Sequence, residues 1–236
     1  MAGSSFGTIF RLTTWGESHG KGVGVVVDGV PAGLSLSEED IQVYLDRRKP
    51  GQNRFTTKRK ESDTVQILSG TFEGKTSGTP ISMVVWNEDQ HSKDYSDIAS
   101  YYRPGHADYT FDAKYGFRDY RGGGRSSGRE TIPRVAAGAI ALKMLSELGI
   151  TVSAYTRSIG DAEIQSFDAA EIANNALNMP DAEAAEKASE LLTKAMAEKN
   201  SVGGVVECVV HHMPAGVGDP VFEKLDANLA KALVSI

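Results

Sequence analysis

The stretch RSSGRETIPRVAAGAIALKMLSELG, residues 125–149, joins a loop rich in Gly, Ser and Arg to the strongest helical pattern in the chain. Apolar residues recur from Ile132 to Leu148 at the three- and four-residue spacing of a helix that buries one face. Gly149 follows the last of them and is placed to end the helix in the left-handed conformation. The sequence therefore predicts a helix that begins directly after the loop.

Strands and helices are mixed without regular alternation in the rest of the chain. Ser37 and Asp40 have the spacing of a capping box and predict a helix that Pro50 and Gly51 end. No dinucleotide-binding fingerprint follows a strand, so we predict an α+β fold rather than a doubly wound sheet. The expected strands are 23–28, 64–68, 81–86, 150–156 and 203–210, and the remaining expected helices are 181–199, taken as exposed, and 223–236.

Length and composition are those of an ordinary soluble protein, with 236 residues, of which 40% are hydrophobic and 24% are charged. We expect one domain over residues 1–236. The lone cysteine, Cys208, excludes an internal disulfide and is expected to be a small buried residue in a reducing compartment. No segment has the apolar run of a signal peptide or of a membrane span, so we expect a cytoplasmic protein.

Basic residues gather in one segment although the chain carries a formal net charge of −6. Seven of the fourteen residues in 47–60 are Lys or Arg. This local excess indicates a site that attracts anions, and a solvated charged face is the alternative. The stretch 87–129 has little periodicity. Its length and its content of Tyr, Arg, Gly and Asp favour an ordered functional loop.

The loop RGGGRSSGRET, residues 121–131, has the composition of an anion-binding site. Its place before a helix directs backbone N–H groups and the positive helix end toward a ligand. Arg125 and Arg129 can make forked hydrogen bonds to phosphate, and Ser126 and Ser127 add hydroxyl donors. The loop lacks the pattern of a Walker A loop. A flexible RGG-like tail is the alternative, and the apolar helix that follows argues against it.

Two Gly-His pairs are candidates for proton transfer. The motif WGESHG contains His19, and the motif RPGHADYT contains His106 together with Arg103 and Asp108. Histidine changes charge near neutral pH, so it can donate a proton to a leaving oxygen. For His19 the alternative is a turn in which the ring only caps a strand. With one cysteine and no His-x3-His pattern, we expect no metal site.

Four motifs together resemble the chorismate synthase family, in order along the chain. They are WGESHGKGVGVVVDGVP, DRRKPGQNRFTTKRKESD, YRPGHADYTFDAKYG and RGGGRSSGRETIPRVAAGA. Motifs of this length do not match four times in order by chance. The resemblance implies a β-α-β sandwich of mixed sheets and helices and a homotetramer.

The resemblance also implies an activity. Chorismate synthase eliminates phosphate and a ring hydrogen from 5-enolpyruvylshikimate 3-phosphate to give chorismate, and it requires reduced FMN without net redox change. The substrate carries two carboxylates and one phosphate, and FMN adds another phosphate, so electrostatics favours a converging set of arginines. Nearby guanidinium groups lower the pKa of a histidine and make it a stronger acid.

Roles of individual residues follow from the same resemblance. His19 would protonate the departing phosphate, and His106 would set the protonation of the reduced flavin. Arg125, Ser126 and Ser127 would contact FMN. The set that would hold the substrate's anionic groups or the adjoining flavin phosphate is Ser18, Arg47, Arg48, Arg54, Arg103 and Arg129. Among these, Arg48 and Arg54 are also positions for a nicotinamide nucleotide. Whether NADPH or an external reductase supplies the electrons stays open.

The resemblance covers about the first two-thirds of the family's chain. The later part of that chain holds further FMN contacts and an Asp assigned to proton removal. We therefore expect residues 1–236, taken as truncated at the C-terminus, to bind FMN poorly and turn over little or nothing. The alternative function is a catalytically incompetent flavin- or phosphate-binding fragment of the same family.

Two further classes of partner and activity are excluded. A nucleic-acid binder would show aromatic residues between the basic ones and a less acidic overall charge. A phosphate-transferring kinase would show a metal-holding acid and a phosphate-loop lysine. We therefore expect a small-molecule substrate, no nucleic acid and no membrane.

Overall fold

The computed structural model describes residues 3–56, 61–88, 99–121 and 123–236. They fall into two compact units, each of which is described by itself. The first comprises Met1–Pro50, Lys58–Met144 and Leu229–Ile236, and the second comprises Gly51–Thr57 and Leu145–Asn228. The single domain expected over 1–236 stays a prediction.

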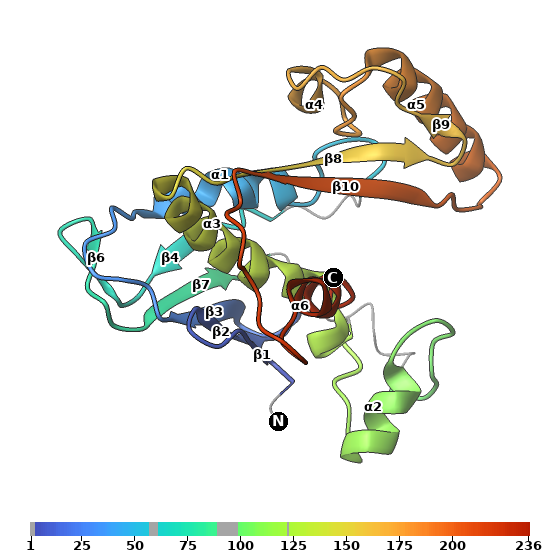
Figure 1. Ribbon diagram of the computed structural model, residues 1–236. Helices are drawn as coiled ribbons and strands as arrows, with labels where there is room; N and C mark the ends of the chain where they lie inside the picture. The colour runs from blue at the N-terminus through green and yellow to red at the C-terminus, as the bar shows by residue number, and fades with distance from the viewer. Residues whose placement is uncertain (1–2, 57–60, 89–98, 122) are drawn as a thin grey trace. The chain divides into compact units, whose positions relative to one another are not determined.

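A five-stranded sheet is the base of the first unit (Figure 1). Its strands are β1 (Ser5–Phe6), β2 (Arg11–Gly16), β3 (Gly22–Asp28), β4 (Val65–Ile67) and β7 (Ile81–Trp86). Their order is β1-β2-β3-β7-β4, and every neighbouring pair is antiparallel. Val23, Val25 and Val27 alternate along the central strand and are buried on one face, as the period of a strand requires. The strands expected at 23–28, 64–68 and 81–86 are confirmed.

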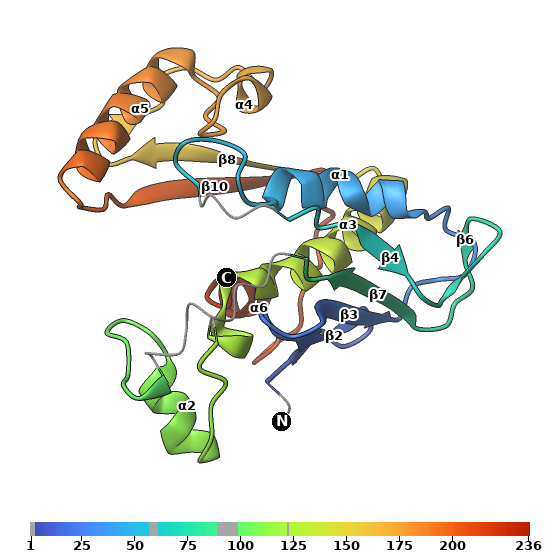
Figure 2. The same ribbon diagram turned by 180° about the vertical axis from the view of Figure 1, so that it is seen from behind.

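Two helices, α1 (Glu38–Arg48) and α3 (Thr131–Glu147), lie side by side on one face of this sheet (Figures 1 and 2). Ile41 and Leu45 of α1 and Ile140 of α3 are buried in one cluster with the sheet valines. Burial of each such side chain stabilises the unit by about 1.5–3 kcal/mol. The predicted α+β class is confirmed, and this unit has one sheet and the helical layer of the predicted sandwich.

The helix α3 begins at Thr131, directly after the Gly- and Ser-rich loop, as the sequence predicts. No residue from 131 to 145 is exposed, so the packing of α3 extends beyond the one apolar face that its sequence predicts. Gly149 follows it with φ of +74°, so the expected left-handed residue after the helix is confirmed. This helix fixes the position of the loop, because the loop has no independent core.

The stretch 87–129 contains more regular structure than expected. Residues 89–98 lie outside the described part, but α2 (Asp108–Tyr115) is a clear helix, and two single-turn 3₁₀ helices span Gly124–Ser126 and Gly128–Glu130. Within α2 the buried residue is the charged Asp108 and not an apolar one. The helix therefore has no apolar stripe that a sequence pattern could detect. Ion pairs with neighbouring loops hold this helix in place.

The first unit also contains a small hairpin of β5 (Thr71–Phe72) and β6 (Lys75–Thr76).

The second unit pairs a three-stranded sheet with a helix. The sheet has the order β10-β8-β9. Met179 and Ala188 are fully buried in the core of this unit, and Phe55 packs against the same cluster. The elements are β8 (Thr151–Ile159), β9 (Ala162–Glu163), α4 (Glu171–Asn174), α5 (Ala182–Ala197) and β10 (Gly204–His211), followed by α6 (Leu225–Leu233), which crosses into the first unit.

Two expectations for this part of the chain are wrong. The helix α5 was expected to be exposed, but Ala184, Ala185 and Ala188 are buried because its small face packs on the sheet. Asp181 does cap it, accepting a hydrogen bond from the Ala184 amide at 3.1 Å. Cys208 was expected to be buried, but it is exposed. It lies on β10, an edge strand on which side chains of both faces reach solvent.

None of the helices in the described ranges combines the length and apolar character that crossing a bilayer requires.

Candidate functional site

His19 lies in the tight turn between β2 and β3, where it is only 7% exposed, and Ser18 beside it is 1% exposed. The Ser18 hydroxyl and His19 Nδ1 are 3.0 Å apart, so the serine fixes the ring. The Asn87 side-chain amide donates to the Glu17 carbonyl at 2.9 Å and to the Gly20 carbonyl at 2.8 Å. The turn is therefore held from outside, and His19 is a positioned residue rather than a loose loop tip.

Asn87 also joins this turn to Arg129. Its Oδ1 accepts from Arg129 Nε at 2.9 Å. Arg129 Nη1 donates to Asp63 at 3.0 Å and lies 3.7 Å from Glu61. The side chains of both acids are 0% exposed, and that of Arg129 is 5% exposed. A predicted substrate residue is therefore buried next to the histidine turn, held by three side chains that distant segments supply.

Arg48 reaches the same cluster from the C-terminal end of α1. Its Nη1 lies 3.1 Å from the second carboxylate oxygen of Asp63. Its Nε donates to the Thr131 hydroxyl at 3.0 Å, and its Nη2 donates to the Gly128 carbonyl at 2.8 Å. Arg48 thus fastens the first turn of α3 to α1. The two arginines and two carboxylates of this cluster balance in charge, which a buried ionic group requires.

One donor of the cluster stays unused. Arg129 Nη2 is buried and has no hydrogen-bond partner among the described residues. A buried donor without an acceptor is costly, and an anionic oxygen would satisfy it. This atom is the clearest sign in the structure that the cluster belongs to a ligand site.

Arg125 is turned back toward the sheet. Its two terminal nitrogens lie 2.7 Å and 3.0 Å from the two carboxylate oxygens of Glu130, a forked pair. It also donates to the Thr14 hydroxyl at 2.8 Å and to the Gly16 carbonyl at 3.1 Å. This residue therefore locks the loop onto β2 beside the histidine turn. The contact with FMN that the sequence predicts for Arg125 stays a prediction.

The two serines of the loop serve different purposes. Ser127 precedes the second 3₁₀ helix, and its hydroxyl accepts from the Arg129 amide at 3.4 Å. Ser126 is exposed, and its hydroxyl donates to the Gly123 carbonyl at 2.7 Å. Gly123 has φ of +83°, a conformation that favours glycine and that closes this turn. The hydroxyl of Ser126 is therefore accessible to a ligand, whereas that of Ser127 shapes the loop.

Arg103 is held by Asp108 much as Arg129 is held by Asp63. Arg103 Nε and Nη2 each donate to Asp108 at 2.9 Å, and Arg118 Nη1 lies 3.4 Å from the same carboxylate. Arg103 also approaches residues 121–131, which we call the anion loop. Its Nη2 lies 3.9 Å from the position that a Cβ on Gly123 would occupy. The hydrogen bonds from Arg103 outweigh the desolvation that burial brings and hold the pKa of Asp108 well below its usual range.

We expect Asp108→Asn to loosen α2 in a pH-dependent way. The folded pKa is depressed, so the stabilisation is fully present above the unfolded pKa of about 3.9 and declines as the pH falls below it. At pH 6 the variant should lose about 1.5–3 kcal/mol of protection in the α2 amides, the value of hydrogen bonds to a charged group. The measurement is hydrogen exchange at pH 6 and pH 3, corrected for intrinsic rates. An equal loss at both pH values would contradict the assignment.

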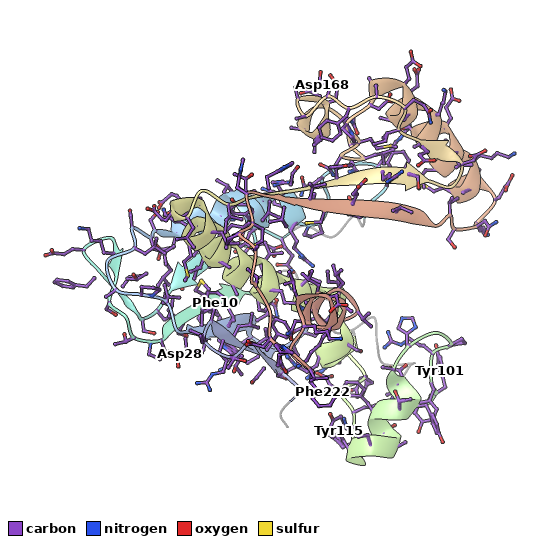
Figure 3. The ribbon with its side chains drawn as sticks, in the orientation of Figure 1. Phe10, Asp28, Tyr101, Tyr115, Asp168 and Phe222 are labelled. Carbon is purple, nitrogen blue, oxygen red and sulfur yellow. The ribbon has the colours of Figure 1, made fainter. Side chains whose placement is uncertain are left out.

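His106 is exposed, and its Nδ1 lies 3.0 Å from the Pro104 carbonyl. The segment around it carries exposed aromatic side chains, of which Figure 3 labels Tyr101 and Tyr115 on either side of α2. Its loop approaches the anion loop at Arg103, three residues before His106. The ring of His106 is therefore accessible from solvent. The flavin role that the sequence predicts for it stays a prediction.

Arg47 and Arg54 are not among the residues that the contacts described above bring together. Arg47 is exposed at the end of α1. Arg54 belongs to the second unit, where its guanidinium lies 4.7 Å from the ring centre of Phe55. Lys58, Arg59 and Lys60, which complete the basic segment, lie outside the described residues. The roles predicted for Arg47 and Arg54 stay predictions.

Sequence reasoning missed the carboxylates and the amide that organise the site. Glu61 and Asp63 follow the basic run directly in KRKESD, and the closeness of two acids to that run is the one signal that could have revealed them. Asn87 carries no such signal.

Asp119 is another acid of the site that sequence reasoning missed. Burial raises its pKa, but hydrogen bonds from Arg121 and the nearby charge of His19 lower it further, so that the pKa lies below its usual value. A negative charge thus stays close to the histidine.

The donor set fits an anionic cofactor and substrate. The unused Arg129 Nη2 suits a phosphate or carboxylate oxygen, and the exposed Ser126 hydroxyl can turn from the Gly123 carbonyl to donate to another. Within the described ranges, no three side chains of the His, Cys, Asp and Glu types gather as metal ligands would. The chemistry available is therefore anion binding beside a buried histidine.

Comparison with known proteins gives one consistent result. A family model described as chorismate synthase matches residues 10–236. The chorismate synthases of Agathobacter rectalis and Lachnospira eligens are 73% and 67% identical over 238 residues, covering 100% of this chain and 65% of each relative. A crystal structure of chorismate synthase superposes with a TM-score of 0.78 at 33% identity, covering 97% of this chain and 67% of that chain. The chain therefore spans about two thirds of its relatives' length.

Proposed function

This chain belongs to the chorismate synthase family, and on that premise we propose that its protein converts 5-enolpyruvylshikimate 3-phosphate to chorismate with reduced FMN. The single observation that carries the proposal is the link through Asn87. It joins the turn of His19 to the buried Arg129, whose Nη2 lacks an acceptor. A proton donor and an anion-binding guanidinium are what an elimination of phosphate needs at one place.

The reaction breaks a C–O bond to release phosphate and a C–H bond at another ring carbon, whose electron pair goes into the new ring unsaturation. The proton from that carbon goes to the Asp that the resemblance assigns to the later part of the family's chain. FMN, when bound in its reduced form, supplies electron density to the breaking C–O bond. Arg129 binds an anionic oxygen of the substrate through Nη2, which has no partner among the described residues. His19 donates a proton to the departing phosphate, which lowers the charge on the leaving group. Ser18 holds the imidazole, and Asp119 keeps a negative charge close to it.

Other loop residues complete the proposed ligand contacts. Ser126 offers its exposed hydroxyl to the flavin phosphate, while Arg125 and Ser127 hold the loop in the shape that this contact requires. His106 sets the protonation of the reduced flavin from its exposed loop. We further propose that the substrate contacts include Ser18, Arg47, Arg48, Arg54 and Arg103, and that Arg48 and Arg54 serve a nicotinamide nucleotide where NADPH is the reductant.

The assembly and compartment of the protein are also part of this proposal. A homotetramer is supported by exposed apolar side chains such as Phe222, Val206 and Ile236, which are 89%, 73% and 82% exposed and would be buried between copies. A reducing compartment such as the cytoplasm suits a chain whose one cysteine is free.

The proposed function predicts a flavin signal that depends on substrate. Under anaerobic conditions, residues 1–236 joined to the later part of the family's chain are mixed with reduced FMN and then with 5-enolpyruvylshikimate 3-phosphate, and flavin absorbance and chorismate are followed together. We expect a spectral change that requires substrate, with chorismate formed. Oxidised FMN is the control and should give no chorismate. A spectral change without chorismate would support a flavin-binding fragment, and no change at all would contradict both functions.

A further inference from the structure

We propose that Asp63 is a positioning residue of the anion site, whose carboxylate holds the guanidinium groups of Arg48 and Arg129 in one orientation. The inference rests on the proposed function, because it states how the site assigned there keeps its shape. Neither composition nor the family comparison assigns a role to this acid.

The first argument is the division of the carboxylate between two arginines. Oδ1 accepts from Arg129 Nη1 at 3.0 Å, and Oδ2 accepts from Arg48 Nη1 at 3.1 Å. The Asp63 side chain is 0% exposed, so water does not compete for either oxygen. Charged hydrogen bonds are strong in such surroundings. One acid therefore sets the separation of two long side chains that come from α1 and from the anion loop.

The second argument is the completeness of the hold on Arg129. Asp63 and Glu61 lie on one side of the guanidinium, and Asn87 accepts from its Nε at 2.9 Å. These contacts leave Nη2 as the donor with no hydrogen-bond partner among the described residues. A planar group held at Nε and at Nη1 cannot rotate, so its last donor points in a fixed direction. Preorganisation of this kind favours binding, because less side-chain freedom is lost with the ligand.

The third argument is the backbone at this position. Asp63 has φ of +48°, a left-handed conformation that residues other than glycine avoid. Gln42 of α1 holds the segment in that conformation. Its Nε2 donates to the Asp63 carbonyl at 3.3 Å, and its Oε1 accepts from the Val65 amide at 3.0 Å. Strained backbone that its neighbours enforce is characteristic of functional sites. Here it directs the carboxylate inward toward both arginines.

The test uses residues 1–236 joined to the later part of the family's chain, labelled at arginine, and compares this protein with its Asp63→Asn variant. The arginine Nε–H resonances of Arg48 and Arg129 report whether each guanidinium is fixed, and they need no ligand. The dissociation constant for 5-enolpyruvylshikimate 3-phosphate in the presence of FMN reports whether the site is affected. We expect both resonances to shift and exchange faster, and the dissociation constant to rise about 10- to 100-fold.

Two comparison variants separate positioning from general destabilisation. Asp28→Asn removes the carboxylate of an exposed pair with Arg11, labelled in Figure 3 at the end of β3, and should change neither readout. Gln42→Ala removes the support of the Asp63 backbone and should shift both readouts in the same direction as Asp63→Asn, but less. If Asp63→Asn does not fold, Asp63→Glu keeps the charge and moves it by one methylene, and the same changes are expected of it.

Each outcome has a distinct meaning. Unchanged Nε–H resonances in a folded Asp63 variant would overturn the positioning role, whatever the ligand does. Shifted resonances with a dissociation constant within twofold of the unsubstituted protein would also overturn it, because the orientation would not matter to binding. If the unsubstituted protein binds no substrate, the proposed function fails, and the resonances still decide whether Asp63 fixes the arginines.

Discussion

Replacing Arg129 with methionine is expected to destabilise the first unit by about 3–5 kcal/mol, the cost of leaving a buried charge without its partner. Glu61 and Asp63 are both fully buried, and Arg129 is the residue that contacts both. Methionine fills much of the volume but neutralises neither acid. The loss should appear in urea unfolding followed by tryptophan fluorescence, because Trp15 and Trp86 both lie in the sheet of this unit.

Two further variants make this result specific. Arg121→Met removes a guanidinium that is 45% exposed and paired with Asp119, so it should cost less than about 1 kcal/mol. Adding Asp63→Asn to Arg129→Met returns the cluster to charge balance, with Arg48 against Glu61, and should restore part of the stability. If the double variant is less stable than Arg129→Met by the full effect of Asp63→Asn alone, the two residues are not coupled and the buried network has been misassigned.

The substitution His19→Gln is expected to lower turnover by about 10²- to 10⁴-fold, the usual contribution of a general acid, while substrate affinity changes little. Glutamine keeps a polar side chain next to Ser18 but has no proton to donate to a leaving phosphate. The measurement is chorismate formation with reduced FMN under saturating substrate, together with the dissociation constant of the substrate. The unsubstituted protein in the same assay sets the scale.

The matched control for this variant is His211→Gln, which changes an exposed histidine at the end of β10 in the second unit and should leave turnover unchanged. A His19→Gln protein that keeps turnover within threefold would rule out the proton-donor role. A loss that lies entirely in substrate affinity would show instead that His19 binds the substrate without donating a proton.

A common arrangement links these predictions. The arginines of the site are each held by a carboxylate. Glu130 holds Arg125, Asp108 holds Arg103, and Asp63 holds both Arg48 and Arg129. The site is therefore a set of fixed donors with little excess charge, and not a bare positive patch. Such a site selects ligands by the direction of its donors more than by long-range attraction.

The chain's pattern was enough to predict most of the secondary structure. The helix α3 was predicted because its apolar residues repeat at helical spacing, and β3 because valines follow one another between glycines. The helix α2 was not predicted, because its residues DYTFDAKY have no apolar stripe and it is held by ion pairs with Arg103 and Arg118. Cys208 was misplaced because burial of a strand face depends on what covers it, which is a property of the whole fold.

The sequence by itself determined which chemistry this protein can perform. Arginines, hydroxyls and glycines before an apolar helix, with two Gly-His turns, specify anion binding and proton transfer, because these properties belong to the side chains themselves. Only the tertiary structure decided which of those groups are joined and which are already paired. Asp63 and Glu130 lie within the motifs and Asn87 lies outside them, but the effect of all three depends on distances of about 3 Å that no spacing along the chain encodes.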